Sequence, residues 1–241
     1  MTKTNQQKVK DFLINNGVII VMFILVIYTG FTSDNFFTKN NFMNILMNMS
    51  SRLVIALGIA GCVITAGCDL SAGRMIGFGA CISGMLLQRM DYSGKFFPDM
   101  QPLNVFVVAL IAMLVCAAFG TVTGFFIAYL NVPPFIATLA MMEIVYGIGL
   151  IVTNATPLGG YVEQYTNVSN GKFLGINYLI WIAIIVAAIT WFIFNMTRHG
   201  KYMYAIGGNP QAAEVAGVPV KATLILIYMK AAAMYLSLIH I

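Results

Sequence analysis

The fold is decided by residues 103–134, LNVFVVALIAMLVCAAFGTVTGFFIAYLNVPP, which lie in an uncharged interval between Asp99 and Glu143. About 20 apolar residues cross a hydrocarbon core about 30 Å thick, so this interval has room for two membrane spans. Lipid offers no hydrogen bonds to the backbone, and such runs therefore form helices. The NVPP tetrapeptide divides the interval, because proline lacks an amide donor and keeps the preceding residue out of the helical region. We predict one span over 103–130 and the next over 135–153.

The rest of the chain has the same character. Of its 241 residues, 60% are hydrophobic and 9% are charged, whereas soluble domains carry about 25% charged residues. Two more uncharged intervals separate Asp11 from Asp34 and Lys172 from Arg198. We therefore predict an all-α, polytopic transmembrane helical bundle of six to seven spans, forming one domain over residues 1–241. The remaining predicted spans are 14–32, 43–67, 72–88, 178–196 and a last one from residue 222 to the end.

Basic residues orient this bundle. The N-terminal tail and the loop at 197–221 each hold three Lys or Arg residues, whereas the similar-sized loop at 154–177 holds one. Cytoplasmic loops carry the excess of Lys and Arg. Six spans between the two basic segments would put both, and hence the N-terminus, in the cytoplasm. That parity requires the region 43–88 to cross the membrane twice rather than once.

The C-terminal end departs from the pattern of a complete span. The chain stops inside an apolar run, AAAMYLSLIHI, and Lys230 lies in the middle of the last predicted span, where a cation is costly. We expect the sequence to be truncated at this end, with residues in 230–241 that are foreign to the native protein.

A short polar segment, AIGGNPQAAEVAGVP at 205–219, stands out in this apolar chain. Asn209 is a favourable N-cap, and Pro210 then occupies the first helical position, where its missing donor costs nothing. Gly217 falls where a left-handed helix stop belongs. We predict a helix of about seven residues, preceded by a flexible Gly207–Gly208 entry.

So short a helix is marginal in water and needs a surface to hold it. One alternative is that it rests on the bilayer, as helices do that have bulky apolar residues on one face and Lys or Arg on the other. Here Val215 is the only sizeable hydrophobe and Glu214 the only charge, while the alanines permit close approach. We therefore interpret residues 205–219 as a cytoplasmic docking segment for a protein partner.

Several motifs together resemble the permeases of bacterial ABC sugar importers of the ribose/galactose type. These are GGNPQAAEVAGV after RHGK, TAGCDLSAGRMIGFGA, and AYLNVPPFIATLAMM. SSRLVIALGIAG and LLQRMDYSGKFFPDM are most similar to the galactose/methyl-galactoside branch of that family. The resemblance covers nearly all of residues 10–229 and ends after Met229.

The resemblance implies an inner-membrane permease that works as a homodimer with two ATP-binding subunits and a periplasmic sugar-binding protein. It implies no bound cofactor and no enzymatic activity in this chain, with ATP used by the partner; consistently, no G-x-x-x-x-G-K-[ST] phosphate loop is present. No basic stripe with interleaved aromatics suggests nucleic acid. The residues that the resemblance assigns to the ATPase contact are Gly207, Gly208, Asn209, Pro210, Gln211, Ala212, Ala213, Glu214 and Gly217.

The segment CDLSAGR places Asp69, Ser71 and Arg74 between two apolar stretches. In one interpretation Asp69 caps the third helix, with Arg74 paired nearby. In the other, the three residues belong to a broken helix whose free backbone groups line a translocation path or gate.

Other features leave alternatives open. A stripe of small residues on the fourth span favours close helix packing, within the bundle or between subunits; so does a similar stripe on the third span. Glu143, inside the fifth span, is either a proton-coupling carboxylate or a structural group. With Asp69 it could serve an ion-coupled secondary transporter, the alternative to the ATP-driven importer. The two stripes are Ala112, Cys116, Gly120, Gly124, Ala128 and Gly73, Gly77, Ala80, Gly84.

Overall fold

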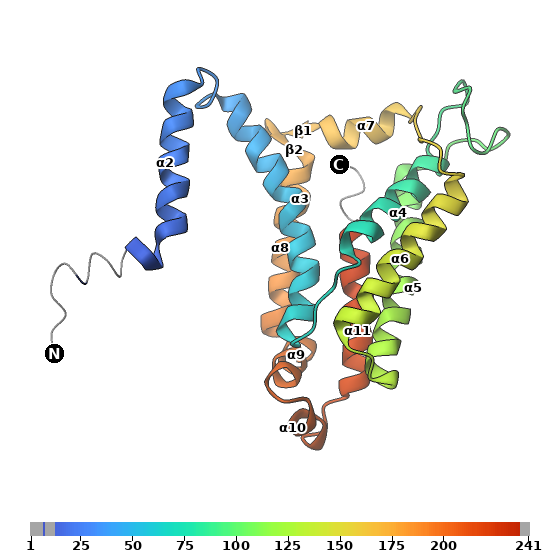
Figure 1. The fold of residues 1–241 in the computed structure, drawn as a ribbon. Helices are drawn as coiled ribbons and strands as arrows, with labels where there is room; N and C mark the ends of the chain where they lie inside the picture. The colour runs from blue at the N-terminus through green and yellow to red at the C-terminus, as the bar shows by residue number, and fades with distance from the viewer. Residues whose placement is uncertain (1–6, 8–12, 237–241) are drawn as a thin grey trace. The chain divides into compact units, whose positions relative to one another are not determined.

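The computed structural model describes residues 7 and 13–236 and divides the chain into two compact units, residues 1–46 and 47–241 (Figure 1). The three lysines predicted to orient the N-terminal tail and the last residues of the predicted seventh span, 237–241, lie outside the described residues.

The first unit holds α2 (Gly17–Thr32) and the beginning of α3 (Lys39–Ile64). No residue of α2 is buried, although its sequence is almost entirely apolar. Its two threonine hydroxyls, of Thr29 and Thr32, are satisfied locally because they donate to backbone carbonyls of the preceding turn. An apolar helix whose polar groups bond to its own backbone is suited to a lipid environment.

The second unit is a helical bundle with a two-stranded hairpin. Across both units, five described helices are long and apolar enough to cross a membrane, namely Leu13–Thr32 of the first unit, α3, α5, α6 and α8, and α4 is a shorter apolar helix. The prediction of an all-α transmembrane bundle is confirmed. The further elements are α4 (Ala72–Leu86), α5 (Val105–Leu130), α6 (Pro134–Thr153), α7 (Glu163–Asn170), β1 (Lys172–Phe173), β2 (Ile176–Asn177), α8 (Tyr178–Met196), α9 (Arg198–Gly208), α10 (Pro210–Val215) and α11 (Val220–Tyr235).

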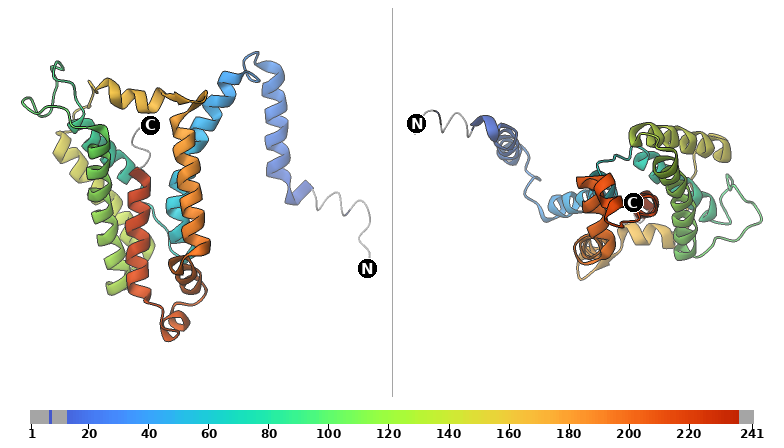
Figure 2. Two further views of the ribbon diagram at one scale, coloured as in Figure 1. Left: turned by 180° about the vertical axis from the view of Figure 1, so that it is seen from behind. Right: turned by 90° about the horizontal axis from the view of Figure 1, so that it is seen from below.

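The core of this unit is the contact between α5 and α11, which run side by side in both views of Figure 2. Two members of the small-residue stripe of α5, Gly120 and Gly124, face α11. A Cβ atom added at Gly124 would lie 2.7 Å from the Ile225 Cα, and one at Gly120 would lie 2.7 Å from the Ala232 Cβ. The stripe therefore serves packing within the bundle, one of the two interpretations offered by the sequence.

The region 43–88 returns across the bundle in an unusual way. α3 ends beside α9, residues 65–71 then run back as non-helical chain, and α4 continues toward the opposite end (Figure 1). The predicted third span, 72–88, therefore corresponds to α4, which ends two residues earlier, and the predicted second span, 43–67, already becomes non-helical at residue 65.

Both predicted loops after α6 contain regular structure. The segment 154–177 includes α7 and the β1–β2 hairpin, and the segment 197–221 includes α9 as well as α10. α7 is short and polar, so it lacks the apolar periodicity that marks a helix in sequence. The loop also bonds back to the end of α4, because Val162 N–H donates to the Leu87 carbonyl and Arg89 N–H to the Gly160 carbonyl.

Candidate functional site

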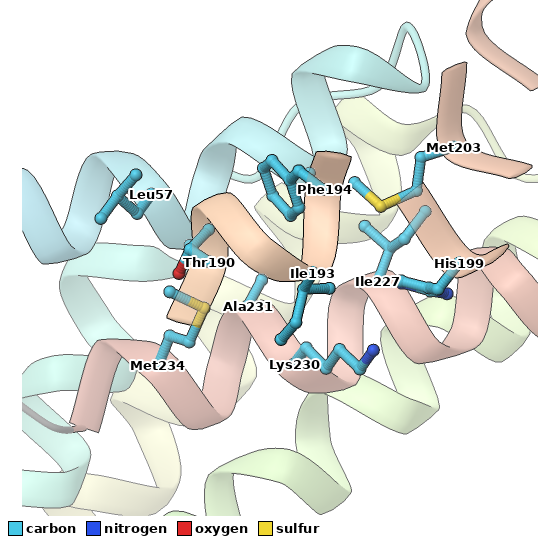
Figure 3. Close-up of a pocket in the computed structure, with 12 residues that line it drawn as sticks. Leu57, Thr190, Ile193, Phe194, His199, Met203, Ile227, Lys230, Ala231 and Met234 are labelled. Atoms are coloured by element: carbon cyan, nitrogen blue, oxygen red, sulfur yellow. The ribbon is translucent and has the colours of Figure 1, made fainter. Parts of the chain in front are cut away.

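The predicted docking segment is held on the bundle by α9. The Thr197 side chain caps α9 by accepting a hydrogen bond from Gly200 N–H, at 3.3 Å. On the inner face of α9, Met203 and Ile206 are each 1% exposed. Figure 3 shows Met203 directed toward Phe194 of α8 and Ile227 of α11, around a small cavity that α3 also lines. α9 is thus packed against α3, α8 and α11 at once.

Gly207 and Gly208 are not the flexible entry that the sequence predicts, because they form the last turn of α9. A Cβ atom at Gly207 would overlap the carbonyl oxygen of Ile64 and lie 3.5 Å from the Thr65 Cα, whereas at Gly208 it would meet nothing within 4 Å. Gly207 is therefore required for a close backbone contact between α9 and the end of α3. Pairs of glycines indicate flexibility only where no other backbone approaches them.

α10 has the ends that the sequence predicts, with six residues instead of about seven. Asn209 Oδ1 accepts from Ala212 N–H at 3.0 Å, and Pro210 is the first helical residue. At the other end Gly217 has φ +82°, its N–H donates to the Glu214 carbonyl, and Val218 N–H donates to the Ala213 carbonyl. These two bonds and the left-handed glycine make a Schellman motif, which satisfies the last carbonyls of the helix.

The two faces of α10 differ sharply. Ala213 is 4% exposed and packs inward, whereas Val215 is 90% exposed. Of the residues predicted to meet the ATPase, Ala213 is thus buried, and the exposed ones are Gly208, Asn209, Pro210, Gln211, Ala212, Glu214 and Gly217. Gly207, by contrast, is partly buried against α3. The structure thus brings these residues together at one end of the bundle, with a small-residue surface open to contact.

Asp69 has a different role from the helix cap considered above. Ser71 precedes α4 as its N-cap residue and makes no side-chain cap bond. Asp69 is 8% exposed, and its Oδ1 accepts from Ser71 N–H at 2.9 Å and from Ser71 Oγ at 2.6 Å. Its Oδ2 accepts from the Tyr235 hydroxyl at 2.8 Å. The carboxylate therefore stabilises the non-helical segment, and its hydrogen bond from Tyr235 links that segment to α11.

Arg74 is not paired with Asp69. Its guanidinium carbon lies 3.8 Å from the centre of the Tyr146 ring on α6. Since one helical turn separates Arg74 from Ser71, its side chain leaves the break and crosses to the neighbouring helix. The structure therefore separates the three residues that the sequence grouped: Asp69 and Ser71 are internal, and Arg74 reaches the α4–α6 surface. Glu143 is exposed on α6.

His199 lies at the start of α9, and Figure 3 shows the Lys230 side chain of α11 directed toward its imidazole. Partial burial lowers the pKa of His199, and the positive charge of Lys230 lowers it further. Within the described residues, no group of three His, Cys, Asp or Glu side chains could hold a metal ion.

Comparison with known proteins identifies a family and several relatives that are similar to this chain. Residues 41–234 match the family described as the permease component of the branched-chain amino acid transport system. The galactose/methyl galactoside import permease MglC of Escherichia coli K12 is 39% identical over 98% of this chain and 72% of its own length. The MglC protein of Haemophilus influenzae is 40% identical over the same shares. The ribose import permease RbsC of Escherichia coli K12 is 31% identical over 91% of this chain and 66% of its own length. No solved structure is significantly similar.

Proposed function

Because the chain belongs to the family of branched-chain amino acid transport permease components, we propose that α9 and α10 couple it to the ATP-binding subunit of its importer. As a permease component of a bacterial ABC sugar importer, it is a multi-pass membrane protein and a transport subunit rather than an enzyme. It binds no cofactor, and ATP is hydrolysed by a separate subunit. The resemblance recognised in the sequence is confirmed.

The observation that carries the coupling proposal is the shape of residues 205–219. A capped helix with an exposed small-residue face stands at the end of the bundle where α9 is anchored. On its inner side, the Gly207 backbone touches Ile64, directly before the broken segment at 65–71. A force applied to α10 would therefore reach the membrane interior through α9 and the end of α3.

The proposed mechanism is alternating access within a single permease domain spanning residues 1–241. Closure of the ATP-binding subunits moves α10, and the non-helical segment at 65–71 acts as the gate. Asp69 and Ser71 stabilise that segment, and Arg74 lies on the path of the sugar. Long rigid helices transmit displacement, whereas a broken helix supplies the place where the path can open and close.

The proposed cargo is galactose or methyl galactoside. The chain is 39% identical to a permease named for those sugars and 31% identical to one named for ribose. The proposed assembly contains a periplasmic sugar-binding protein and a second copy of this permease in the bacterial inner membrane. The excess of Lys and Arg in the N-terminal tail and at 197–221 supports a cytoplasmic N-terminus and a cytoplasmic α10.

Uptake of labelled D-galactose by proteoliposomes containing the assembled importer tests this function. We expect accumulation that requires ATP and the binding protein and that persists when a proton or sodium ionophore collapses the ion gradients. Uptake without the ATP-binding subunit, abolished by the ionophore, would instead support an ion-coupled secondary transporter.

A matched pair of glycines tests the docking segment. Gly217 and Gly175 have φ values of +82° and +78°, and neither has an atom within 4 Å of an added Cβ. Alanine at either position therefore costs about 1–2 kcal/mol of backbone strain. We expect Gly217→Ala to weaken co-purification with the ATP-binding subunit, and Gly175→Ala, in the β1–β2 turn, to leave it unchanged. Equal recovery of the two variants would count against docking at α10.

A further inference from the structure

The face formed by α4 and α6 carries charged side chains at a depth where lipid would not tolerate them. α6 has 20 residues and is therefore about 30 Å long, so Glu143 and Tyr146 lie about 14 Å and about 18 Å from its first residue. Both are exposed, as is Arg74, whose guanidinium covers the Tyr146 ring. Arginine or acidic residues at the middle of a membrane helix cost several kcal/mol in lipid and normally face a protein or water-filled interior.

The three side chains also share one surface. Glu143 precedes Tyr146 by three residues, which is the spacing that puts side chains on the same side of a helix. Arg74 reaches this side from α4, and its contact distance of 3.8 Å to the ring centre fixes the relative position of the two helices there. The Arg74 guanidinium and the Tyr146 ring therefore meet near the middle of α6, and Glu143 lies one helical turn away on the same side of that helix.

Beside this cluster runs an open groove of about 230 Å³ between α4 and α6. The groove is open along α4, because a Cβ atom added at Gly73 or Gly77 would have no other atom within 4 Å. Ligand pockets have volumes of about 300–1,000 Å³, so one chain supplies the larger part of a small site and a second wall would complete it. The residues that line it include Arg74, Gly77, Cys81, Tyr146, Gly149 and Thr153.

We propose that this α4–α6 groove forms one wall of the sugar passage, with Arg74, Tyr146 and Glu143 as its polar contacts. A monosaccharide presents hydroxyl groups that accept from a guanidinium and donate to a carboxylate, and its C–H face packs on an aromatic ring. The charges remain stable in the membrane because the passage contains water and sugar instead of lipid. This inference rests on the proposed function and extends it to residues beyond the broken segment.

Cys81 is a native reporter of the groove. Cys62 and Cys116 are fully buried, and Cys68 can be replaced by serine, which leaves Cys81 as the accessible thiol among the described cysteines. In the Cys68→Ser importer we expect a charged, membrane-impermeant methanethiosulfonate to modify Cys81, as read by mass spectrometry. D-Galactose at ten times its dissociation constant should slow the reaction about tenfold, with mannitol as the control. Reaction with a lipid-soluble maleimide alone would place the groove against lipid and overturn the proposal.

Gly77→Leu and Gly147→Leu form a matched pair for transport. Both glycines are helical with no atom within 4 Å of an added Cβ, but only Gly77 lines the groove. We expect Gly77→Leu to abolish uptake and Gly147→Leu to retain it, while both still bind the ATP-binding subunit. Normal uptake by Gly77→Leu would overturn the groove assignment and leave the importer function standing.

Arg74→Ala removes charge-assisted hydrogen bonds, so galactose uptake should fall about tenfold or more. Unchanged uptake would contradict the assignment. Absence of ATP-driven galactose uptake in the unmodified importer would count against the proposed function instead, and the reaction of Cys81 with the charged reagent would still test whether the groove contains water.

Discussion

Replacing Gly207 by alanine is the sharpest single perturbation of the proposed coupling path. The added Cβ would overlap the Ile64 carbonyl oxygen and lie 3.0 Å from the carbonyl carbon, both of which are backbone atoms. No side-chain rotation relieves this overlap, so α9 and the end of α3 have to separate by about 1.5 Å to restore ordinary contact in a close-packed interior. Gly208 is the natural control, since an added Cβ there meets nothing within 4 Å.

The expected size of the effect follows from packing costs. Forcing extra volume into a packed contact costs about 1–3 kcal/mol. For a protein of this length, each kcal/mol shifts the Tm by about 2–4 °C, so a cost of about 2 kcal/mol predicts a fall of about 4–8 °C. Gly208→Ala should be neutral or slightly stabilising, because alanine exceeds glycine in helix propensity by up to about 1 kcal/mol.

Two measurements on the same pair separate stability from coupling. Thermal unfolding of each purified variant in detergent gives the Tm, and proteoliposomes give ATP-driven galactose uptake at a temperature well below both transitions. We expect Gly207→Ala to lose both stability and uptake, whereas Gly208→Ala, which lies at the proposed ATPase contact but meets no clash, should keep its stability. Equal Tm values and equal uptake for the two variants would refute the claim that α9 transmits movement through its contact with Ile64.

Three further predictions test the packing described above by thermal unfolding. Asp69→Asn and Tyr235→Phe should each lower the free energy of unfolding by about 1–3 kcal/mol. The double variant should lose less than the sum of the two, because both changes remove the hydrogen bond from the Tyr235 hydroxyl to Asp69. Simple additivity would contradict that bond. Gly120→Ala should destabilise the α5–α11 contact by about 1–3 kcal/mol, whereas Gly73→Ala, at an open position, should not; equal effects would exclude the packing role of the α5 stripe. The depressed pKa of His199 means that the unfolded chain binds its proton more readily, so stability should fall as the pH drops below about 6.5, and His199→Gln should show a smaller fall. An unchanged pH profile in that variant would remove His199 as the cause.

The transmembrane helices could be predicted closely because lipid imposes a simple rule on the sequence. Spans predicted at 178–196 and 135–153 agree with α8 and α6 to within one residue at each end, since charge and proline mark their limits. Both ends of α10 could also be predicted from the sequence, because helix caps depend on residues that are close together in the chain.

Features that depend on contacts between distant segments could not be read in this way. The pair Gly207–Gly208 predicts a flexible entry, but the Ile64 backbone lies so close to Gly207 that this glycine is a packing position. Arg74 was grouped with Asp69 by sequence proximity, whereas its partner Tyr146 is on another helix. The second partner of Asp69, Tyr235, comes from α11. Sequence spacing predicts which side chains share a face, and it says little about which helices are neighbours.

Cysteine cross-linking at α10 tests the central claim most directly. Val215 on α10 and Leu174 in the turn between β1 and β2 are 90% and 78% exposed. Figure 1 shows α10 and the β1–β2 hairpin at opposite ends of the bundle. In membranes containing the whole importer, we predict that Val215→Cys forms a cross-link to the ATP-binding subunit whose yield changes when ATP is bound, and that Leu174→Cys forms none. A cross-link from Leu174→Cys, or none from Val215→Cys in an importer that still takes up galactose, would contradict the assignment of residues 205–219 as the coupling segment.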